Sequence, residues 1–381
     1  MSISRHLWFL LWFLPCVFAV MTAQADDAPE SRYAGTWSGT LGRSEIRACF
    51  NMFGHGEYYY LRHRRPLRLQ GEGDDIEQRE AQLMAALADG RIRVSEVGGP
   101  AFEPTPPTGH WSLHAEGEDA LLGEWTDPAG QRVLPLRLSR AATRGASDGE
   151  CDAAYYAPIA EAVRISRDTT TFEGRTYEQW TTADAVAMAP AADSPGAAAI
   201  RAASEAWLRD RAVFAFQCEA GRGMAGEPLG ASLEPVVWTD TWLVQRDGLP
   251  DTYCGGAHGN FSTDYRVWDL RGGERIDAWT WIIEGEAALR GDDRDDGGVE
   301  TTAFSALLKS RHPRNLADDD CREAIDHMTV SAPYPTRDGL VFPNSFFHAM
   351  RACGDDIVLP WREAEPFLSE AGRDLKRTFS E

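Results

Sequence analysis

The stretches RIRV (91–94), HWSLH (110–114), LLGEW (121–125) and VLPLRL (133–138) follow one another at short, nearly regular intervals. They are rich in residues of high β propensity, and the sequence DPAG at 127–130 supplies a turn before the last of them. Earlier stretches of the same kind lie at 33–40, 46–50 and 58–61. Short strands with turn residues between them predict a small antiparallel β barrel or sandwich in the N-terminal part of the chain.

The composition limits the classes of function. The chain has 381 residues, of which 43% are hydrophobic, and a formal net charge of −21 at pH 7. This hydrophobic content rules out a disordered chain, and the length allows two or three domains. Nucleic acid is an unsuitable partner, because phosphate binding needs clustered Lys and Arg, and here acidic residues outnumber basic ones by 59 to 38. The charge suits a basic partner instead.

The first 25 residues have the features of a signal peptide. Arg5 and His6 precede an apolar run at 7–20, and Ala23-Gln24-Ala25 provides the small residues of a cleavage site. We therefore expect a mature protein that begins at Asp26, is periplasmic or secreted, and has no membrane span.

Export changes the interpretation of the cysteines. Six remain beyond the signal peptide, none in a C-x-x-C pair, and an oxidising compartment favours disulfides over free thiols. Several pairings are possible, and the preferred one follows domain membership. It joins Cys49 to Cys151, Cys218 to Cys254, and Cys321 to Cys353.

A looser segment at 141–150 divides the chain. We expect a β-rich domain over 26–150 and, over 151–381, an α+β domain with an antiparallel sheet and flanking helices, so that the fold class is α+β. The expected strands of the second domain are 163–166, 174–180, 233–245 and 265–270, and a hairpin turn is expected at 271–274. The expected helices of the chain are 77–87, 198–216 and 302–310. Residues 183–197 are expected to form a connector.

Two motifs in the second domain resemble a known family. YCGGAHGN (253–260), followed by WDLRGGERI (268–276), is similar to the C-terminal extracytoplasmic domain of RsiV-type anti-sigma factors, a domain also found beside some peptidoglycan deacetylases. The later DGLVFP (338–343) and DIVLPW (356–361) resemble the way that domain ends. The resemblance covers 195–371, less fully 155–195, and leaves out the N-terminal β unit.

The resemblance implies an α+β ligand-binding module outside the cytoplasm. In RsiV-type proteins this module recognises lysozyme, which is often basic, so an acidic chain would suit it electrostatically. The sigma-binding segment and the deacetylase domain are not expected here, so neither activity transfers. We expect a non-catalytic protein of the bacterial cell envelope that recognises lysozyme or peptidoglycan fragments.

The candidate ligand-binding residues lie in the first motif, because glycines let the backbone approach a ligand closely. They are Gly255, Gly256, Ala257, His258 and Asn260. An alternative function is an envelope-directed hydrolase that uses His258, with Asp264 following six residues later. The favoured interpretation of His258 is structural, and we expect no catalytic residue, cofactor or metal, because nucleophile-elbow, HExxH and P-loop motifs are absent from the sequence.

Three further patterns have competing interpretations. His110 and His114 share one face of a strand but lie too far apart to bind one metal ion. The stretch YYYLRHRR (58–65) would suit a glycan or anion site, but a strand with buried tyrosines and exposed arginines is favoured. The acidic GDDRDDGG (291–298) lacks the spacing of a calcium loop and is interpreted as a solvated loop.

Overall fold

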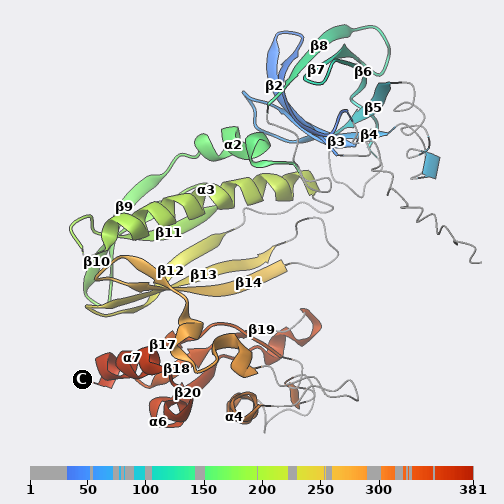
Figure 1. Ribbon diagram of the computed structural model, residues 1–381. Coiled ribbons are helices and arrows are strands. Elements are labelled where there is room, and N and C mark those ends of the chain that lie inside the picture. Colours follow the sequence, from blue (N-terminus) through green and yellow to red (C-terminus); the bar gives the residue numbers. More distant parts are fainter. Residues whose placement is uncertain are drawn as a thin grey trace, which may run out of the picture.

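The computed structural model describes three units, a barrel, a large sheet covered by a long helix, and a C-terminal unit of short elements (Figure 1). The signal peptide, the loop 291–298 and most of the helix expected at 77–87 lie outside the described residues. The structure describes residues 32–51, 55–71, 77–78, 81, 90–98, 105–141, 151–194, 196–221, 230–252, 254, 260–289, 302–313, 321–322, 325, 328–345 and 348–380.

The N-terminal unit is a closed antiparallel barrel, which decides between the two expected architectures. Its strands follow chain order, and β8 returns to pair with β1, placing Trp37 opposite Arg140 and Leu41 opposite Leu136. Strand β4 was not expected from the sequence. The strands are β1 (Gly35–Leu41), β2 (Ser44–Phe50), β3 (Gly56–Tyr60), β4 (Leu67–Gly71), β5 (Arg91–Val97), β6 (Gly109–Glu116), β7 (Ala120–Thr126) and β8 (Val133–Arg140).

Large side chains fill the barrel. Trp37, Phe50, Tyr58 and Trp111 are all fully buried, and the Trp111 ring contacts both Phe50 and Tyr58. Closed barrels of eight strands are just wide enough for such filling. The buried faces also explain the period-two pattern of the strands, because alternate residues point into this core.

The second unit is a seven-stranded sheet in the order β15-β14-β13-β12-β11-β10-β9. It is mixed rather than purely antiparallel as expected, because β11 and β12 run parallel across the helical crossover α3. The expected connector at 183–197 contains β11, and the strand expected at 233–245 is divided by a turn at 239–241. The elements are α2 (Ala153–Glu161), β9 (Ser166–Phe172), β10 (Arg175–Thr181), β11 (Ala185–Pro190), α3 (Ala197–Gly221), β12 (Ala231–Trp238), β13 (Trp242–Thr252), β14 (Asn260–Asp269) and β15 (Glu274–Ile276).

Helix α3 covers one face of this sheet (Figure 1). Trp207 and Leu208 of the helix are buried in one cluster with Ala187 and Ala189 of β11. The small alanine side chains allow the helix backbone to come close, which is why β11 lacks the bulky residues that identify a buried strand.

The turn at 271–274 is the predicted hairpin turn between β14 and β15. Gly273 has φ +71° and packs against Gly196, where a Cβ on either residue would come within 3 Å of the other segment's backbone. Both positions therefore require glycine.

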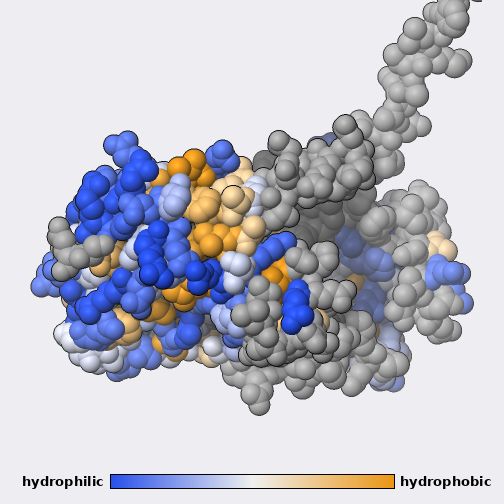
Figure 2. All heavy atoms as spheres, turned by 90° about the horizontal axis from the view of Figure 1, so that it is seen from below, coloured by the Kyte–Doolittle hydropathy of each residue, from blue (hydrophilic) through white to orange (hydrophobic). Residues whose placement is uncertain are grey.

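The C-terminal unit covers the other face of the sheet. Val244 and Val267 of the sheet share a buried cluster with Trp281, Phe342 and Leu359. Seen from below, the coloured part of the surface is mostly hydrophilic, with apolar residues gathered in one part of it (Figure 2). The elements are η1 (Ala278–Trp281), η2 (Gly285–Leu289), α4 (Ala303–Arg311), β16 (Thr329–Val330), β17 (Tyr334–Pro335), β18 (Gly339–Phe342), β19 (Asn344–Ser345), η3 (His348–Cys353), β20 (Ile357–Pro360), α6 (Trp361–Ala364), η4 (Glu365–Phe367) and α7 (Glu370–Ser380).

The six cysteines form three disulfides in the preferred pairing, Cys49–Cys151, Cys218–Cys254 and Cys321–Cys353. The pairs fit a protein that matures in an oxidising, non-cytoplasmic compartment. Within the described part of the chain, no helix is long and apolar enough to cross a membrane.

Thiol labelling of the denatured, unreduced mature protein should detect no free cysteine. Each disulfide removes two thiols, and each should stabilise the fold by about 2–4 kcal/mol. Mass spectrometry after alkylation checks this result, and two or more alkylated cysteines would contradict the pairing.

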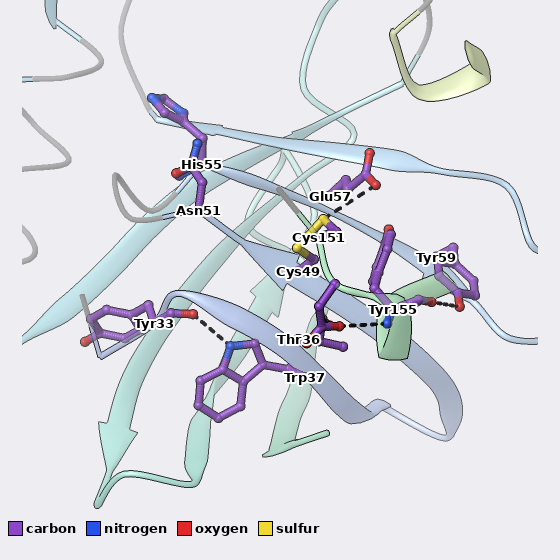
Figure 3. Close-up of a disulfide and its surroundings, with 11 residues drawn as sticks. Tyr33, Thr36, Trp37, Cys49, Asn51, His55, Glu57, Tyr59, Cys151 and Tyr155 are labelled. Atoms are coloured by element: carbon purple, nitrogen blue, oxygen red, sulfur yellow. Dashed lines mark hydrogen bonds between the residues drawn. A yellow bond between two sulfur atoms is a disulfide. The ribbon is translucent and has the colours of Figure 1, made fainter. Parts of the chain in front are cut away.

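A small aromatic cluster joins the barrel to the sheet unit (Figure 3). The Tyr59 ring of β3 contacts Tyr155 of α2 and Phe216 of α3, with ring centroids 5.2 Å apart in both pairs. The Tyr59 hydroxyl donates to the Tyr155 carbonyl oxygen at 2.7 Å, and Thr36 Oγ1 donates to Asp152 Oδ1 at 2.6 Å. The domain boundary near residue 150 is therefore bridged by packing as well as by the Cys49–Cys151 disulfide.

The division into two domains stays a prediction with a direct test. We expect residues 26–151 to fold alone, because the barrel core uses only residues between Tyr33 and Leu138. Near-ultraviolet circular dichroism and cooperative thermal unfolding of this fragment check the result. A fragment without cooperative unfolding would show that the barrel depends on α2 and α3.

Glu57 makes the stability of the boundary depend on pH. Its Oε1 lies 3.9 Å from Cys151 Sγ (Figure 3), and burial raises the pKa of Glu57 from 4.5 to about 7, an effect that the Tyr155 hydroxyl partly opposes. Between these values the folded protein keeps a proton that the unfolded chain releases, so stability should fall as the pH rises from about 4.5 to about 7.

A Glu57→Gln variant should lack this loss and should be more stable than the wild type above pH 7. Urea denaturation of both proteins at pH 5 and pH 8 measures it. An identical change with pH in the two proteins would show that Glu57 is not responsible.

Candidate functional site

A pocket of about 790 Å³ lies between the sheet and the C-terminal unit, on the sheet face opposite α3. Strands β12, β13 and β14 form its floor, and η3 with the segments around β16 and β19 forms the opposite wall. The described lining is mostly polar and consists of Gly230, Ser232, Arg246, Gly248, Leu249, Pro250, Ser262, Thr263, Tyr265, Ser331, Pro343, Asn344, Ser345, Arg351, Gly354 and Asp356.

The pocket lies at the end of the sheet where the first sequence motif connects two strands. Pro250 of β13 and Ser262 of β14 line the pocket, and Asn260 pairs with Thr252 at the start of β14. Gly255, Gly256, Ala257 and His258 lie outside the described residues. The structure therefore places the strands that flank the predicted binding loop in the wall of this pocket.

Strand alternation separates Asp264 from the pocket. Thr263 and Tyr265 of β14 line it, so the intervening Asp264 points to the other face of the sheet, where its side chain is exposed. In the ladder Asp264 is opposite Asp247, which accepts hydrogen bonds from Trp207 and Arg266 on the α3 side. A joint role of His258 and Asp264 in catalysis stays untested.

Tyr265 and Asp356 line the inner part of the pocket, and Tyr334 packs against Tyr265 behind this lining. The rings of Tyr265 and Tyr334 stack with centroids 4.3 Å apart, and the Tyr265 hydroxyl donates to Asp356 Oδ2 at 3.3 Å. Burial raises the pKa of Asp356, and the hydrogen bond from Tyr265 opposes this rise. Burial also raises the pKa values of both tyrosines, so their hydroxyl groups remain protonated donors.

The lining also provides an acceptor that has no donor. Asn344 donates through Nδ2 to the Asp355 carbonyl oxygen, while its Oδ1 is buried and lacks a hydrogen-bond partner among the described residues. A buried acceptor of this kind costs free energy unless a ligand or water supplies a donor. Because this oxygen is shielded from solvent, it lies behind the surface of the pocket.

Guanidinium groups supply the positive charge of the pocket. Arg246 lines the sheet side and pairs with Glu234 at 2.7 Å, and Arg351 lines the opposite side from η3. Acceptors and donors therefore face one another across the pocket, an arrangement that suits a polar ligand carrying both kinds of group.

The described lining is short of titratable side chains. It contains one carboxyl group, on Asp356, and neither histidine nor cysteine. Throughout the described residues, no group of three or more histidine, cysteine or carboxylate side chains is placed to hold a metal ion.

The other candidate positions lie in the barrel. His110 is half-buried with its Nδ1 3.2 Å from Ser95 Oγ, and His114 is exposed on the same face of β6. In the stretch 58–65, Tyr58 and Tyr59 are fully buried, and the arginines are exposed. Tyr58 and Tyr59 therefore cannot stack on a sugar, whereas Tyr60 is half-buried.

Sequence reasoning missed Tyr265, Asn344, Arg351 and Asp356 as site residues. Asp356 opens the DIVLPW motif and Tyr265 belongs to an expected strand, but nothing in their spacing joins them. The Tyr265–Asp356 hydrogen bond spans 91 residues of sequence, which only the packing of the C-terminal unit on the sheet brings together.

Comparisons with known proteins give little further information. No family model matches the chain, and no curated protein matches it. A crystal structure of a DUF3298 family protein from Pseudomonas aeruginosa is similar with a TM-score of 0.33 and 13% sequence identity, over 55% of this chain and 93% of that chain. At this level of likeness, the function has to be inferred from the residues of the chain itself.

Proposed function

We propose that this protein is an exported, non-catalytic binding protein of the bacterial cell envelope and that it takes a peptidoglycan fragment in the pocket between the sheet and the C-terminal unit. The observation that carries the proposal is the polar lining, to which the sheet contributes Arg246 and the C-terminal unit contributes Arg351 and Asp356. Peptidoglycan fragments carry hydroxyl groups, amide N–H groups and carboxylates, which complement such a lining.

The size of the pocket supports a small ligand. Its volume of about 790 Å³ falls within the range of about 300–1,000 Å³ that is usual for small-molecule sites. The resemblance of residues 195–371 to the extracytoplasmic domain of RsiV-type proteins supports recognition of envelope material, and the three disulfides fit the compartment.

The test is a calorimetric titration of the full mature chain with a disaccharide–tetrapeptide fragment of peptidoglycan. Asp356→Asn and Arg351→Gln should each weaken binding by about tenfold or more, because each removes a charged partner of the ligand. Asp168→Asn, on the exposed edge strand β9, is the matched control and should leave binding unchanged. Equal affinity in all four proteins would contradict the assignment of the pocket.

Lysozyme is the second candidate ligand, favoured by the net charge of −21. Its association should slow with salt, since the Debye length falls from about 10 Å at 0.1 M to about 3 Å at 1 M. Surface binding of several lysozymes at two salt concentrations measures this, and no binding at low salt removes lysozyme from the proposal.

The alternative hydrolase makes a different prediction. If His258 is catalytic, His258→Ala should abolish turnover of cell-wall fragments while the fold stays intact. The binding function is supported if the wild-type protein binds the fragment and mass spectrometry shows that the fragment is uncleaved after incubation.

A further inference from the structure

The outer wall of the barrel has a groove of its own, about 390 Å³ in volume, across strands β5 to β8. It lies in a different unit from the pocket and shares no residue with it. We call it the barrel groove. Its described lining is Arg91, Ser112, Leu113, His114, Leu122, Gly123, Glu124, Pro135, Leu136 and Arg137.

Four of these residues form one row across the strands. The register places Arg91 of β5 opposite His114 of β6, His114 opposite Leu122 of β7, and Leu122 opposite Arg137 of β8. Residues opposite one another in a ladder point to the same face, and neighbouring strands lie about 4.8 Å apart, so the Arg91 and Arg137 backbones are roughly 14 Å apart. Two guanidinium groups therefore stand at the ends of the row, with Leu122 and His114 between them.

The two arginines are available for a ligand. Both side chains are exposed, and neither forms an ion pair or a side-chain hydrogen bond with any described residue. Other arginines of the chain are paired, such as Arg140 with Asp119 and Arg201 with Glu178.

The carboxylate that lines the groove does not belong to the row. Glu124 lies two residues further along β7, opposite Ser112 and Pro135. The row is thus a cationic strip on a barrel whose described strands and turns carry more arginines than carboxylates, in a chain that is acidic as a whole.

We propose that the barrel groove binds an extended anionic ligand, with phosphate or carboxylate groups held by Arg91 and Arg137 and the middle of the ligand lying over His114 and Leu122. Guanidinium groups match both kinds of anion through paired N–H donors. Leu122 supplies an apolar contact for the carbon skeleton of a saccharide. This site is independent of the pocket, so the protein has two places at which to hold envelope material.

The test uses calorimetry on the full chain at low ionic strength with three probes. Tripolyphosphate and trigalacturonate carry the two kinds of anion, and maltotriose is a neutral saccharide of the same length as trigalacturonate. We expect one or both anionic probes to bind, maltotriose not to bind, and added salt to weaken binding. Binding of tripolyphosphate alone identifies a phosphate ligand, and binding of trigalacturonate alone identifies a carboxylate ligand.

The double variant Arg91→Gln/Arg137→Gln should weaken this binding by about tenfold or more, equivalent to about 1.4 kcal/mol. The matched control is Arg62→Gln/Arg65→Gln, which removes the same charge from the exposed β3–β4 loop on the other side of the barrel and should change affinity less than about twofold. Thermal unfolding confirms that both variants fold.

Three results would overturn the proposal. They are no binding of either anion at low salt, equal affinity of the groove variant and the wild type, and maltotriose binding as tight as that of trigalacturonate. A Gly248→Phe variant is altered only in the pocket and should bind the anionic probes as the wild type does. Loss of binding at the barrel groove can therefore be told apart from loss of peptidoglycan binding in the pocket.

Discussion

Replacing Glu96 with alanine should lower the free energy of unfolding of the barrel by about 3 kcal/mol or more. Glu96 is buried in the barrel and accepts hydrogen bonds from Tyr58 Oη at 2.5 Å, Thr108 Oγ1 at 2.7 Å, Trp125 Nε1 at 3.0 Å and Trp111 Nε1 at 3.4 Å. The alanine variant leaves these donors without an acceptor, and each orphaned buried donor costs about 1–3 kcal/mol.

Two variants separate the loss of hydrogen bonds from other effects. Glu96→Gln keeps one acceptor oxygen at the same place and should lose less stability than Glu96→Ala. Glu116→Ala removes an exposed glutamate from β6 and should change stability by less than about 0.5 kcal/mol. Chemical denaturation followed by tryptophan fluorescence measures all three, and a Glu96→Ala variant as stable as Glu116→Ala would contradict the network.

Filling the pocket should abolish ligand binding. Gly248 lies in the pocket floor on β13, and a Cβ added there would meet Ser232 Oγ at 3.4 Å and the Ser232 carbonyl oxygen at 3.9 Å. Both are ordinary or slightly tight contacts, so the strand can accommodate a phenylalanine at this position. Its ring would then occupy the space of the ligand. We expect Gly248→Phe to reduce affinity for the peptidoglycan fragment by about a hundredfold or more, equivalent to about 2.8 kcal/mol, because the ring and the ligand cannot occupy the same space.

The matched control introduces the same side chain where nothing obstructs it. Gly98, at the end of β5, has no atom within 4 Å of an added Cβ. Gly98→Phe should therefore bind the fragment as the wild type does. Calorimetric titration compares the three proteins after circular dichroism has shown that they fold, and wild-type affinity in Gly248→Phe would place the ligand elsewhere.

The barrel could be predicted from the sequence because its strands bury one face each, so their periodicity is visible without tertiary information. Strand β4 was missed because it is only five residues long and follows Pro66 directly. Helix α2 was missed for another reason, since Pro158 lies inside it, although Asp152 caps its first turn by accepting from the Tyr155 N–H group.

The sheet unit was predicted less completely because β11 does not resemble a strand in its sequence. Three of the six residues in Ala185–Pro190 are alanine, and the segment forms a strand because α3 and the neighbouring strands bury it. Local propensity gives no sign of this arrangement, which depends on tertiary packing. The disulfide pairing that the sequence favoured is, by contrast, the one in the structure.

The site was predicted only at its edge. The glycine-rich motif indicated the connection between β13 and β14, and the pocket lies against the strands that flank it. The residues that give the pocket its chemistry come from separate segments, with Arg246 on β13, Tyr265 on β14, Asn344 on β19 and Asp356 before β20. Their convergence depends on how the C-terminal unit packs on the sheet, and no local pattern records it.

Hydrogen exchange of the full chain, with and without the disaccharide–tetrapeptide fragment, tests the central claim most directly. Binding in the pocket should slow exchange of backbone amides in 246–252, 260–265 and 343–356, and leave the barrel strands unchanged. Protection that is absent, or that is confined to the barrel, would contradict the assignment of the pocket as the site that binds peptidoglycan fragments.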